Sequence, residues 1–359
     1  MPFTVRRAVR DMAAYVSGES SGDMIQLGFN ESAFPPSPQA IEAARRACRE
    51  IRRYNDENYT GLKRALADRH GLDEDRIICG AGSMDIMRDL AACCLEPGRS
   101  LVTGRLSYAF PGVLARAAGA DVRLVEDSSF THDIDAFIDA VTDRCAILYI
   151  ANPNNPTGTS VGVDAMRHLA EALPDHVLLL IDAAYADYVT SRPAASPDAL
   201  VDEGYNAAVL HTFSKVHGLA GLRTGWAYAG RHVVEAVAKV RLPSVLSAPA
   251  MAAAIASLAD TAYTADVVQQ TRALREKTGA RLAGLGLDVT LSDGNFLMVG
   301  LPQSVAMDAE TLYQRVKARG VLLRRLANFG LGRHVRITIG PPDDMAALDR
   351  VLVEVLADA

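Results

Sequence analysis

Residues 211–226 read HTFSKVHGLAGLRTGW, and this stretch places Lys215 between two hydroxyl side chains and a glycine-rich run. Thr212 and Ser214 offer hydroxyl donors, and the glycine-rich turn lets backbone approach a ligand closely. Arg223 adds a planar guanidinium that binds an anion through two parallel hydrogen bonds. A lone lysine is usually solvated, because an ammonium group is costly to bury. Together, however, these residues indicate a phosphate-binding cup beside an amine.

This setting suggests a covalent role for Lys215. An amine beside a phosphate-anchored aldehyde forms a Schiff base, which is the role open to lysine with pyridoxal phosphate. The alternative from the residues alone is a helix cap with an adjacent surface lysine. Other stretches of the chain can therefore be searched for the remaining contacts of that cofactor.

Asp182 ends the apolar strand at the start of the stretch LLLIDAAYADY, residues 178–188. An uncompensated carboxylate is expensive at such a position, and a pyridinium N–H would compensate it. Asp182 would then keep the ring nitrogen protonated, while Tyr185 donates to the phenolic oxygen of the ring. The alternative is an aspartate that caps the following turn.

Two further turns follow predicted strands. In ANPNNPTG, residues 151–158, prolines and glycine enforce a turn from which Asn155 can donate its amide to the same phenolic oxygen. In CGAGSMD, residues 79–85, the backbone amides of Gly82, Ser83 and Met84 open a helix and form a phosphate site, with the methionine side chain expected in the core.

The stretch 79–85 also permits a dinucleotide-binding loop. It departs from that glycine fingerprint, because Gly80 and Gly82 are followed by Asp85 where the third glycine belongs. About twenty residues further on, no acidic residue is present to bind a ribose. A hydride-transfer enzyme is therefore disfavoured.

The composition favours an enzyme acting on small molecules. The chain has 359 residues, 49% of them hydrophobic, with no apolar run long enough for a membrane span. The 37 basic and 43 acidic residues give a net charge of -6, and neither sign forms a block that would indicate nucleic-acid or membrane binding.

The cysteines predict a reducing compartment and no metal site. They are five in number and include no CxxC pair: Cys48, Cys79, Cys93, Cys94 and Cys145. The N-terminal segment has basic residues but neither the apolar region nor the cleavage site of a secretory signal. We therefore expect a cytoplasmic protein with reduced thiols.

Short apolar runs alternate with helical patterns along most of the chain, as a mainly parallel sheet requires. The strands expected in a large sheet are 76–79, 100–103, 122–125, 146–151, 176–182, 207–213 and 225–230. Helical patterns follow at 233–242 and 248–286. Expected strands at 289–292, 295–301, 321–325 and 335–340, with helices at 308–320 and 345–358, indicate a smaller α/β domain.

Taken together, the motifs resemble those of the fold-type I pyridoxal-phosphate aminotransferases of class I and II, in the branch similar to histidinol-phosphate aminotransferases. The resemblance covers nearly the whole chain. Its motifs, in order, are LGFNESAFPPSP (27–38), YNDENYTGLKRALADRHGL (54–72), GAGSMDIM (80–87), ANPNNPTG (151–158), IDAAYADY (181–188), TFSKVHGLAGLRTG (212–225) and VRITIG (335–340).

The resemblance implies an α/β fold with three parts. We expect an N-terminal arm over 1–39 that contributes to the small domain and to dimer contacts. A large domain over 40–268 would bind the cofactor on a mainly parallel seven-stranded sheet. A smaller C-terminal α/β domain would cover 269–359. The implied protein is a homodimer with shared active sites.

The resemblance also assigns site residues. It implies Lys215 as the Schiff-base lysine, Asp182 as the partner of the pyridine nitrogen, and Tyr108 as the aromatic ring stacked on the cofactor. The other expected cofactor contacts are Gly82, Ser83, Met84, Asn155, Tyr185, Thr212, Ser214 and Arg223. Tyr54 is expected to reach the cofactor phosphate of the partner subunit. Lys215, Asp182 and Tyr108 would be catalytic.

Substrate contacts are implied at Arg336, Arg324 and Asn30. Arg336 in VRITIG matches the anion-binding arginine of the family, and Arg324 lies twelve residues earlier, as in the family pattern. The neighbouring Arg325 is as readily explained by a solvated strand edge.

The expected reaction is transfer of an amino group between an amino acid, or a derived amine such as histidinol phosphate, and a 2-oxo acid. Departures from the family pattern, such as Ala183 after Asp182 and His217 after the lysine, leave the pathway open. The alternatives are a decarboxylase, or an elimination, cyclisation or oxidation enzyme on the same scaffold. A cofactor-dependent regulatory module is disfavoured, because the lysine, aspartate and arginine set is intact and no DNA-binding domain is appended.

Overall fold

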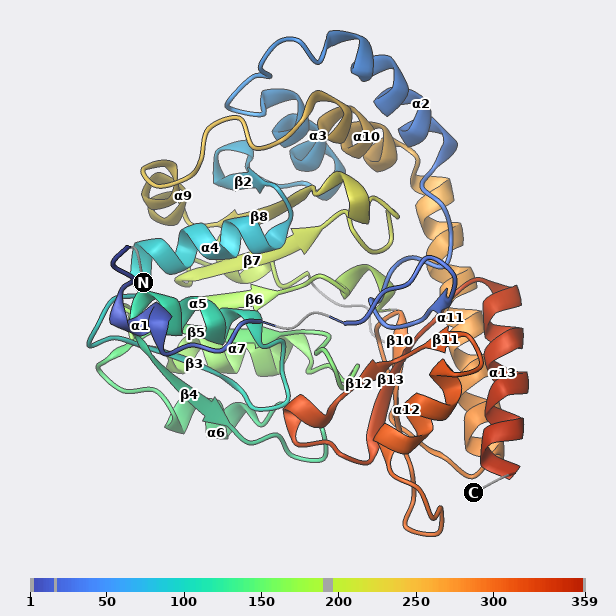
Figure 1. Ribbon diagram of the computed structural model, residues 1–359. Helices are drawn as coiled ribbons and strands as arrows, with labels where there is room; N and C mark the ends of the chain where they lie inside the picture. The colour runs from blue at the N-terminus through green and yellow to red at the C-terminus, as the bar shows by residue number, and fades with distance from the viewer. Residues whose placement is uncertain (1–2, 16–17, 190–195, 358–359) are drawn as a thin grey trace.

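A seven-stranded sheet forms the centre of the larger part of the molecule (Figure 1). The computed structural model describes residues 3–15, 18–189 and 196–357. In spatial order the strands are β2 (Ile77–Gly80), β8 (Gly225–Ala229), β7 (Ala207–Thr212), β6 (Leu178–Asp182), β5 (Cys145–Ala151), β3 (Ser100–Gly104) and β4 (Asp121–Val125). Only β8 is antiparallel to its neighbours β2 and β7. The expected mainly parallel sheet is confirmed.

Successive residues of the central strands belong to two different cores, because strand side chains alternate between the faces of a sheet. On one face the strands pack against α4 (Ser83–Cys94), α5 (Phe110–Ala118) and α9 (Arg231–Ala238). The core on the other face includes residues of α3 (Thr60–His70), α6 (Ile134–Asp139), α7 (Val163–Ala172), α8 (Ala199–Asp202) and α10 (Ala248–Ala259). Burial on both faces explains why these strands are apolar throughout.

A second, smaller sheet is formed by the C-terminal part of the chain, coloured orange to red in Figure 1. Its order is β12 (Arg324–Arg325), β13 (His334–Thr338), β10 (Phe296–Gly300) and β9 (Asp288–Val289), and all of its pairings are antiparallel. The core beside it takes residues from α11 (Thr261–Gly284), α12 (Ala309–Lys317) and α13 (Pro342–Ala357).

The N-terminal segment joins this smaller part. Its strand β1 (Ile25–Gln26) pairs in parallel with β11 (Val321–Leu322), and Leu27 is buried in the small core. The segment also contains α1 (Arg7–Arg10) and leads into α2 (Pro38–Ala47). Short 3-10 helices occur at Cys48–Glu50, Glu74–Arg76, Ala186–Tyr188, Ala220–Leu222 and Ala327–Phe329.

The alanine-rich helical stretch 248–286 is two helices rather than one. Asp260 separates α10 from α11, and its side chain accepts a hydrogen bond from the amide of Tyr263 in the first turn of α11. Aspartate is more favourable at a helix cap than in a helix interior, which explains why the helix breaks at Asp260. Among the described residues no helix has the length and apolar character needed to cross a membrane.

Candidate active site

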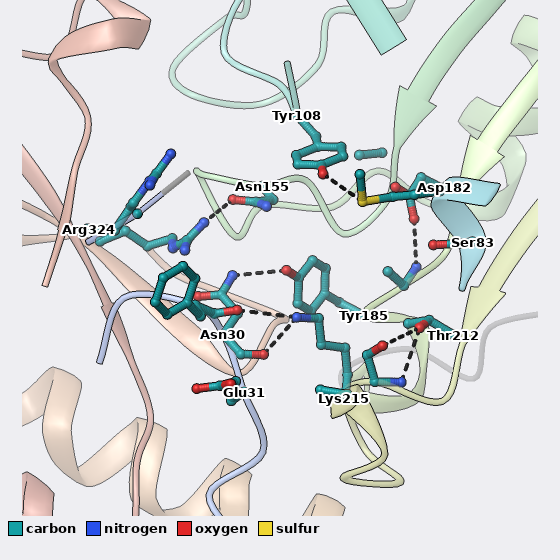
Figure 2. Close-up of a pocket in the computed structure, with 18 of the residues that line it drawn as sticks. Asn30, Glu31, Ser83, Tyr108, Asn155, Asp182, Tyr185, Thr212, Lys215 and Arg324 are labelled. Carbon is teal, nitrogen blue, oxygen red and sulfur yellow. Dashed lines mark hydrogen bonds between the residues drawn. The ribbon is translucent and has the colours of Figure 1, made fainter. Parts of the chain in front are cut away.

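A cavity of about 490 Å³ lies where the large sheet meets the N-terminal segment and the small sheet. Residues at or just beyond the carboxyl ends of β5, β6 and β7 line one side, and residues of β12 and β13 line another. This is the edge at which an open α/β sheet binds ligands. Figure 2 shows the side chains of Asn155, Asp182, Tyr185 and Lys215 gathered around this cavity.

Lys215 follows β7 and points its amine into the cavity (Figure 2). The amine donates to the backbone oxygen of Asn30 at 2.8 Å and, more weakly, to that of Phe29 at 3.4 Å. Burial, and next the nearby charge of Arg336, lower the pKa of Lys215 to about 8. At pH 7 roughly one amine in ten is therefore neutral, far more than for an ordinary lysine, and the neutral form is the one that attacks as a nucleophile.

The N-terminus of α4 and the end of β7 with its following loop bring together four residues expected to bind a phosphate. These residues, called the phosphate cup below, are Ser83, Thr212, Ser214 and Arg223. The Thr212 hydroxyl donates to the Ser214 hydroxyl at 3.0 Å, and a guanidinium nitrogen of Arg223 donates to the same oxygen at 3.3 Å. Gly82 is the N-cap of α4 and offers no side chain to bond the first amides of the helix. Those amides and the Arg223 guanidinium together suit an anion.

Two glycines make this cup possible. Gly82 has φ +88°, and a Cβ there would lie 2.5 Å from a guanidinium nitrogen of Arg223. A Cβ on Gly225 would lie 2.4 Å from the backbone nitrogen of Ser83. Backbone and guanidinium approach so closely only because both positions lack a side chain.

Asp182 ends β6, and both of its carboxylate oxygens accept hydrogen bonds. The Tyr149 hydroxyl donates to Oδ2 at 2.9 Å, and the backbone amide of Ala184 donates to Oδ1 at 3.1 Å. Only 9% of Asp182 is exposed, and burial raises its pKa above the ordinary value although these donors act in the opposite direction. The sequence reasoning missed Tyr149. The sequence offered one signal for this contact: Tyr149 lies two residues before the end of β5, the strand that pairs with β6.

Tyr185 and Asn155 also reach this cavity, each held by a second residue. The side-chain amide of Asn30 donates to the Tyr185 hydroxyl oxygen at 2.9 Å, so the hydroxyl proton is free to point elsewhere. The Asn155 side-chain oxygen accepts a hydrogen bond from Arg336 at 2.5 Å, which leaves its NH₂ group as a donor. Both groups can therefore donate to a ligand, as the sequence predicts.

Arg336 and Arg324 are paired across neighbouring strands, β13 and β12, and both line the cavity. Arg336 is only 6% exposed and also donates to the backbone oxygen of Gly28 at 2.6 Å. Its Nε is buried and has no hydrogen-bond partner within the described chain. Burial lowers the pKa of Arg336 to about 10, so the group remains cationic at neutral pH. A buried guanidinium that lines a cavity suits an anionic ligand.

Of three further residues, Asn30 lines the cavity, whereas Arg325 and Tyr54 do not. Arg325 is exposed and pairs with Glu310 at 3.1 Å, in agreement with a solvated strand edge. The side chain of Asn30 is bonded to Tyr185 and Thr338, while its backbone oxygen takes the lysine amine. Tyr54 is 90% exposed and does not line the cavity of its own chain.

Tyr108 lines the cavity at the start of the segment that leads into α5. Its hydroxyl donates to the sulfur of Met84 at 3.1 Å (Figure 2). The expectation that the Met84 side chain lies in the core is wrong, because the first turn of α4 directs it into the cavity. Tyr15 and Glu31 line the same cavity and were not singled out from the sequence.

Comparison with known proteins agrees with this geometry. Residues 22–354 match the model of the family described as aminotransferase class I and II. The chain belongs to this family. The histidinol-phosphate aminotransferase of Rhodospirillum centenum is 40% identical over 345 residues, with 94% of each chain covered. That of Rhodospirillum rubrum is 38% identical, with 97% of this chain and 95% of the relative covered.

Solved structures of aminotransferases share the fold. Histidinol-phosphate aminotransferase of Sinorhizobium meliloti, solved in complex with pyridoxal-5'-phosphate, superposes with a TM-score of 0.90 at 28% identity, covering 99% of this chain and 98% of that one. Aspartate aminotransferase of Thermus thermophilus has a TM-score of 0.84 at 21% identity and covers 98% of this chain. The expected fold-type I architecture is confirmed.

The aminotransferase is a pyridoxal-phosphate enzyme that moves an amino group between an amino acid or a derived amine and a 2-oxo acid. The alternatives of a decarboxylase or an elimination enzyme are not favoured by these relatives. The cavity fits the cofactor, because the first backbone amides of α4 have no side-chain cap and Arg223 lies close to them. Amides at a helix N-terminus and a guanidinium group together suit a phosphate. Within the described residues no cluster of side chains suits a metal ion.

Proposed function

We propose that this aminotransferase takes an amine that carries a phosphate or carboxylate group, with histidinol phosphate as the leading candidate, and a 2-oxo acid as acceptor. The observation that carries the proposal is the pair of guanidinium groups, Arg336 and Arg324, beside the Lys215 amine in one cavity. Guanidinium groups that line a cavity bind an anion by charge-assisted hydrogen bonds. The names of the relatives from both Rhodospirillum species point to the same amine.

We propose the following contacts to the cofactor. The phosphate cup and the backbone amides of Gly82, Ser83 and Met84 bind its phosphate, and Tyr108 stacks on its ring. Asn155 and Tyr185 donate to the phenolic oxygen. The Tyr185 proton is available for this bond because Asn30 donates to the hydroxyl oxygen and does not accept from it. Lys215 provides the covalent link. When bound, pyridoxal phosphate supplies the electron sink for the pair of electrons left at the substrate α-carbon.

The protein residues then divide the proton transfers between them. The Lys215 amine would remove the proton from the substrate α-carbon and return it to the carbon on the other side of the amino nitrogen, so it would serve as base and then as acid. Its lowered pKa of about 8 suits both roles near neutral pH. Asp182 holds a proton at the ring nitrogen. Arg336 would bind the anionic group of the substrate and so fix its orientation. Lys215, Asp182 and Tyr108 thus remain the proposed catalytic residues.

A panel of amines tests the donor. Purified holoenzyme would be mixed in turn with histidinol phosphate, histidinol, histidine, glutamate and phenylalanine, and the loss of the yellow absorbance followed in a stopped-flow instrument. We expect histidinol phosphate to react with the highest ratio of rate to half-saturating concentration. Histidinol is the matched control, because it lacks only the phosphate. Equal reaction of histidinol and histidinol phosphate would contradict the proposed anion recognition.

Borohydride reduction tests the covalent residue separately. Reduction of the holoenzyme followed by peptide mapping should place the cofactor on Lys215. An adduct on another lysine, or none, would contradict the central assignment whatever the donor is.

We further propose that the active enzyme is a homodimer in which Tyr54 contacts the cofactor phosphate of the partner subunit. The high exposure of Tyr54, and of the nearby Ile51 at 65%, supports a covered surface here. We retain the division into an arm over 1–39, a large domain over 40–268 and a small domain over 269–359 as a proposal. The pairing of β1 with β11 supports the assignment of the arm to the small domain, while helix α11 is continuous across residue 268.

A further inference from the structure

The hydroxyl of Tyr149 is directed at Asp182 from inside the large sheet. Tyr149 is fully buried, and its hydroxyl lies 2.9 Å from Oδ2 of the carboxylate. Among the residues that the structure describes, Tyr149 is the only side chain that donates a hydrogen bond to this carboxylate. The other donor is the backbone amide of Ala184, which no substitution of a side chain removes.

The strand register explains this contact. In the parallel pair β5 and β6, Ala151 is aligned with Asp182 and Tyr149 is aligned with Leu180. Tyr149 therefore lies on the same face as Asp182, two residues before the strand end, because side chains of one face recur every second residue. Its phenol spans that offset along the sheet. Ala151, directly opposite Asp182 in the pairing, has a small side chain.

We propose that Tyr149 is a positioning residue for the aminotransferase reaction: its hydroxyl keeps the Asp182 carboxylate ionised and oriented toward the pyridine nitrogen of the cofactor. The inference rests on the proposed role of Asp182. A carboxylate that accepts a hydrogen bond is less basic than one that does not. With Tyr149 present, the proton shared between the ring nitrogen and Asp182 stays on the nitrogen. Without this donor, the proton moves toward the carboxylate and the ring loses its positive charge.

The electrostatic setting supports this direction. Burial is the main influence on Asp182 and raises its pKa, and the hydrogen bond from Tyr149 is the largest opposing influence. The Ala184 amide and the charges of His211 and Lys215 act in the same direction as Tyr149. Burial and the neighbouring Asp182 raise the pKa of Tyr149 well above its usual value. The phenol therefore keeps its proton and remains a donor.

A merely structural tyrosine is the competing explanation, and the chain offers a matched control. Tyr228 on β8 is also fully buried, and its hydroxyl donates to Oδ1 of Asp202 at 2.6 Å. Neither Tyr228 nor Asp202 lines the cavity. Tyr149→Phe and Tyr228→Phe each remove one hydroxyl from a buried ring and its bond to an aspartate carboxylate. Tyr228→Phe also removes the acceptor of a weak bond from the Asp73 amide. Only Tyr149→Phe removes a hydroxyl from the active site.

The experiment reads the proton on the cofactor directly. Wild type, Tyr149→Phe, Tyr228→Phe and Asp182→Asn would be reconstituted with pyridoxal phosphate labelled with ¹⁵N in the ring, and the nitrogen chemical shift recorded between about pH 6 and 9. We expect wild type and Tyr228→Phe to show the protonated nitrogen. Tyr149→Phe should shift the resonance toward that of neutral pyridine, and Asp182→Asn should shift it further.

The possible outcomes separate this inference from the proposed function. A Tyr149→Phe resonance identical to wild type, with Asp182→Asn shifted, would overturn the role of Tyr149 and leave that of Asp182 standing. An unshifted Asp182→Asn resonance would overturn both. The rate of the half-reaction with the best amine should fall about tenfold in Tyr149→Phe, on the scale of one hydrogen bond to a charged group. An equal fall in Tyr228→Phe would show that loss of a buried hydroxyl bond, and not the contact to Asp182, causes the effect.

Discussion

At the scale of single residues, burial gives two cations of this site unusual properties. Lys215 and Arg336 share one cavity, and the loss of water contact on burial lowers the pKa of each group. The consequences differ because the ordinary pKa of a lysine is lower than that of an arginine. The lysine becomes partly neutral near neutral pH and can act as a nucleophile and base, whereas the arginine stays charged and can only bind and orient.

The first prediction concerns the pH dependence of cofactor capture by Lys215. Only the neutral amine attacks an aldehyde, and the pKa of Lys215 is about 8 in the free protein. The rate of covalent capture by apoenzyme should therefore rise with pH and level off above about 8, rather than near the ordinary lysine value of about 10.4. Stopped-flow absorbance after mixing apoenzyme with pyridoxal phosphate measures it. A rate still rising tenfold per pH unit at pH 9 would show that the amine is an ordinary one.

The second prediction concerns Arg336. Arg336→Lys keeps the charge and loses the planar fork, so affinity for the anionic amine should fall by about 1.5–3 kcal/mol, or roughly ten- to a hundredfold. Cofactor affinity should fall less than amine affinity, because the phosphate cup with Arg223 is unchanged and only the bond from Arg336 to Asn155 is affected. Spectral titration of both proteins with the best amine gives the values. Arg325→Lys, on the exposed strand edge, is the control and should bind like wild type. Equal affinities for wild type and Arg336→Lys would make Arg336 structural.

At the scale of elements, the phosphate cup depends on how closely β8 approaches the first turn of α4. Gly225 begins β8 and pairs with Gly80 at the end of β2, while Gly82 begins the turn into α4. Gly225 thus lies directly beneath the uncapped amides of the helix, with no space for a Cβ. The helix N-terminus and Arg223 act on a phosphate together only if this contact is kept.

The third prediction follows from that contact. Gly225→Ala places a Cβ against backbone atoms of Gly82 and Ser83, which cannot move aside as a flexible side chain does. The first turn of α4 should shift, and affinity for pyridoxal phosphate should fall at least about tenfold, the scale of one charge-assisted hydrogen bond. Fluorescence titration of apoenzyme with the cofactor measures it.

Gly284→Ala is the matched control for Gly225→Ala. Gly284 lies at the exposed end of α11, and no atom stands within 4 Å of a Cβ placed there. Its cofactor affinity should equal that of wild type. Unchanged affinity in Gly225→Ala would show that the cup tolerates displacement of the helix.

At the scale of the whole molecule, the cavity is assembled from parts of the chain that are far apart in sequence. The N-terminal segment supplies Asn30, the large sheet supplies Asp182 and Lys215, and the small sheet supplies Arg336. Hydrogen bonds join these parts, since Lys215 donates to the backbone of Asn30 and Arg336 donates to Asn155. The site is therefore complete only when both sheets and the arm are in place.

The fourth prediction concerns assembly. If the proposed homodimer forms, light scattering should give twice the chain mass of 38.4 kDa. Tyr54→Phe should then weaken cofactor binding about tenfold, because it removes one hydroxyl donor to a charged phosphate. Tyr205→Phe, which loses an exposed bond to Glu171, is the control. A monomer with wild-type cofactor affinity in Tyr54→Phe would contradict the shared site.

The large sheet, the family and the polar residues at the strand ends could be predicted from the amino-acid sequence. Asp182, Asn155 and Lys215 could be found because buried strands are apolar runs and because the turns after them carry distinctive residues. The sequence could not determine which side chains meet. Asn30 and Tyr185 are 155 positions apart, and Tyr149 reaches Asp182 only through the register of β5 on β6. Likewise, the side chain of Met84 was expected in the core and lies in the cavity. Such contacts depend on strand register and on packing between distant segments, which local sequence patterns do not encode.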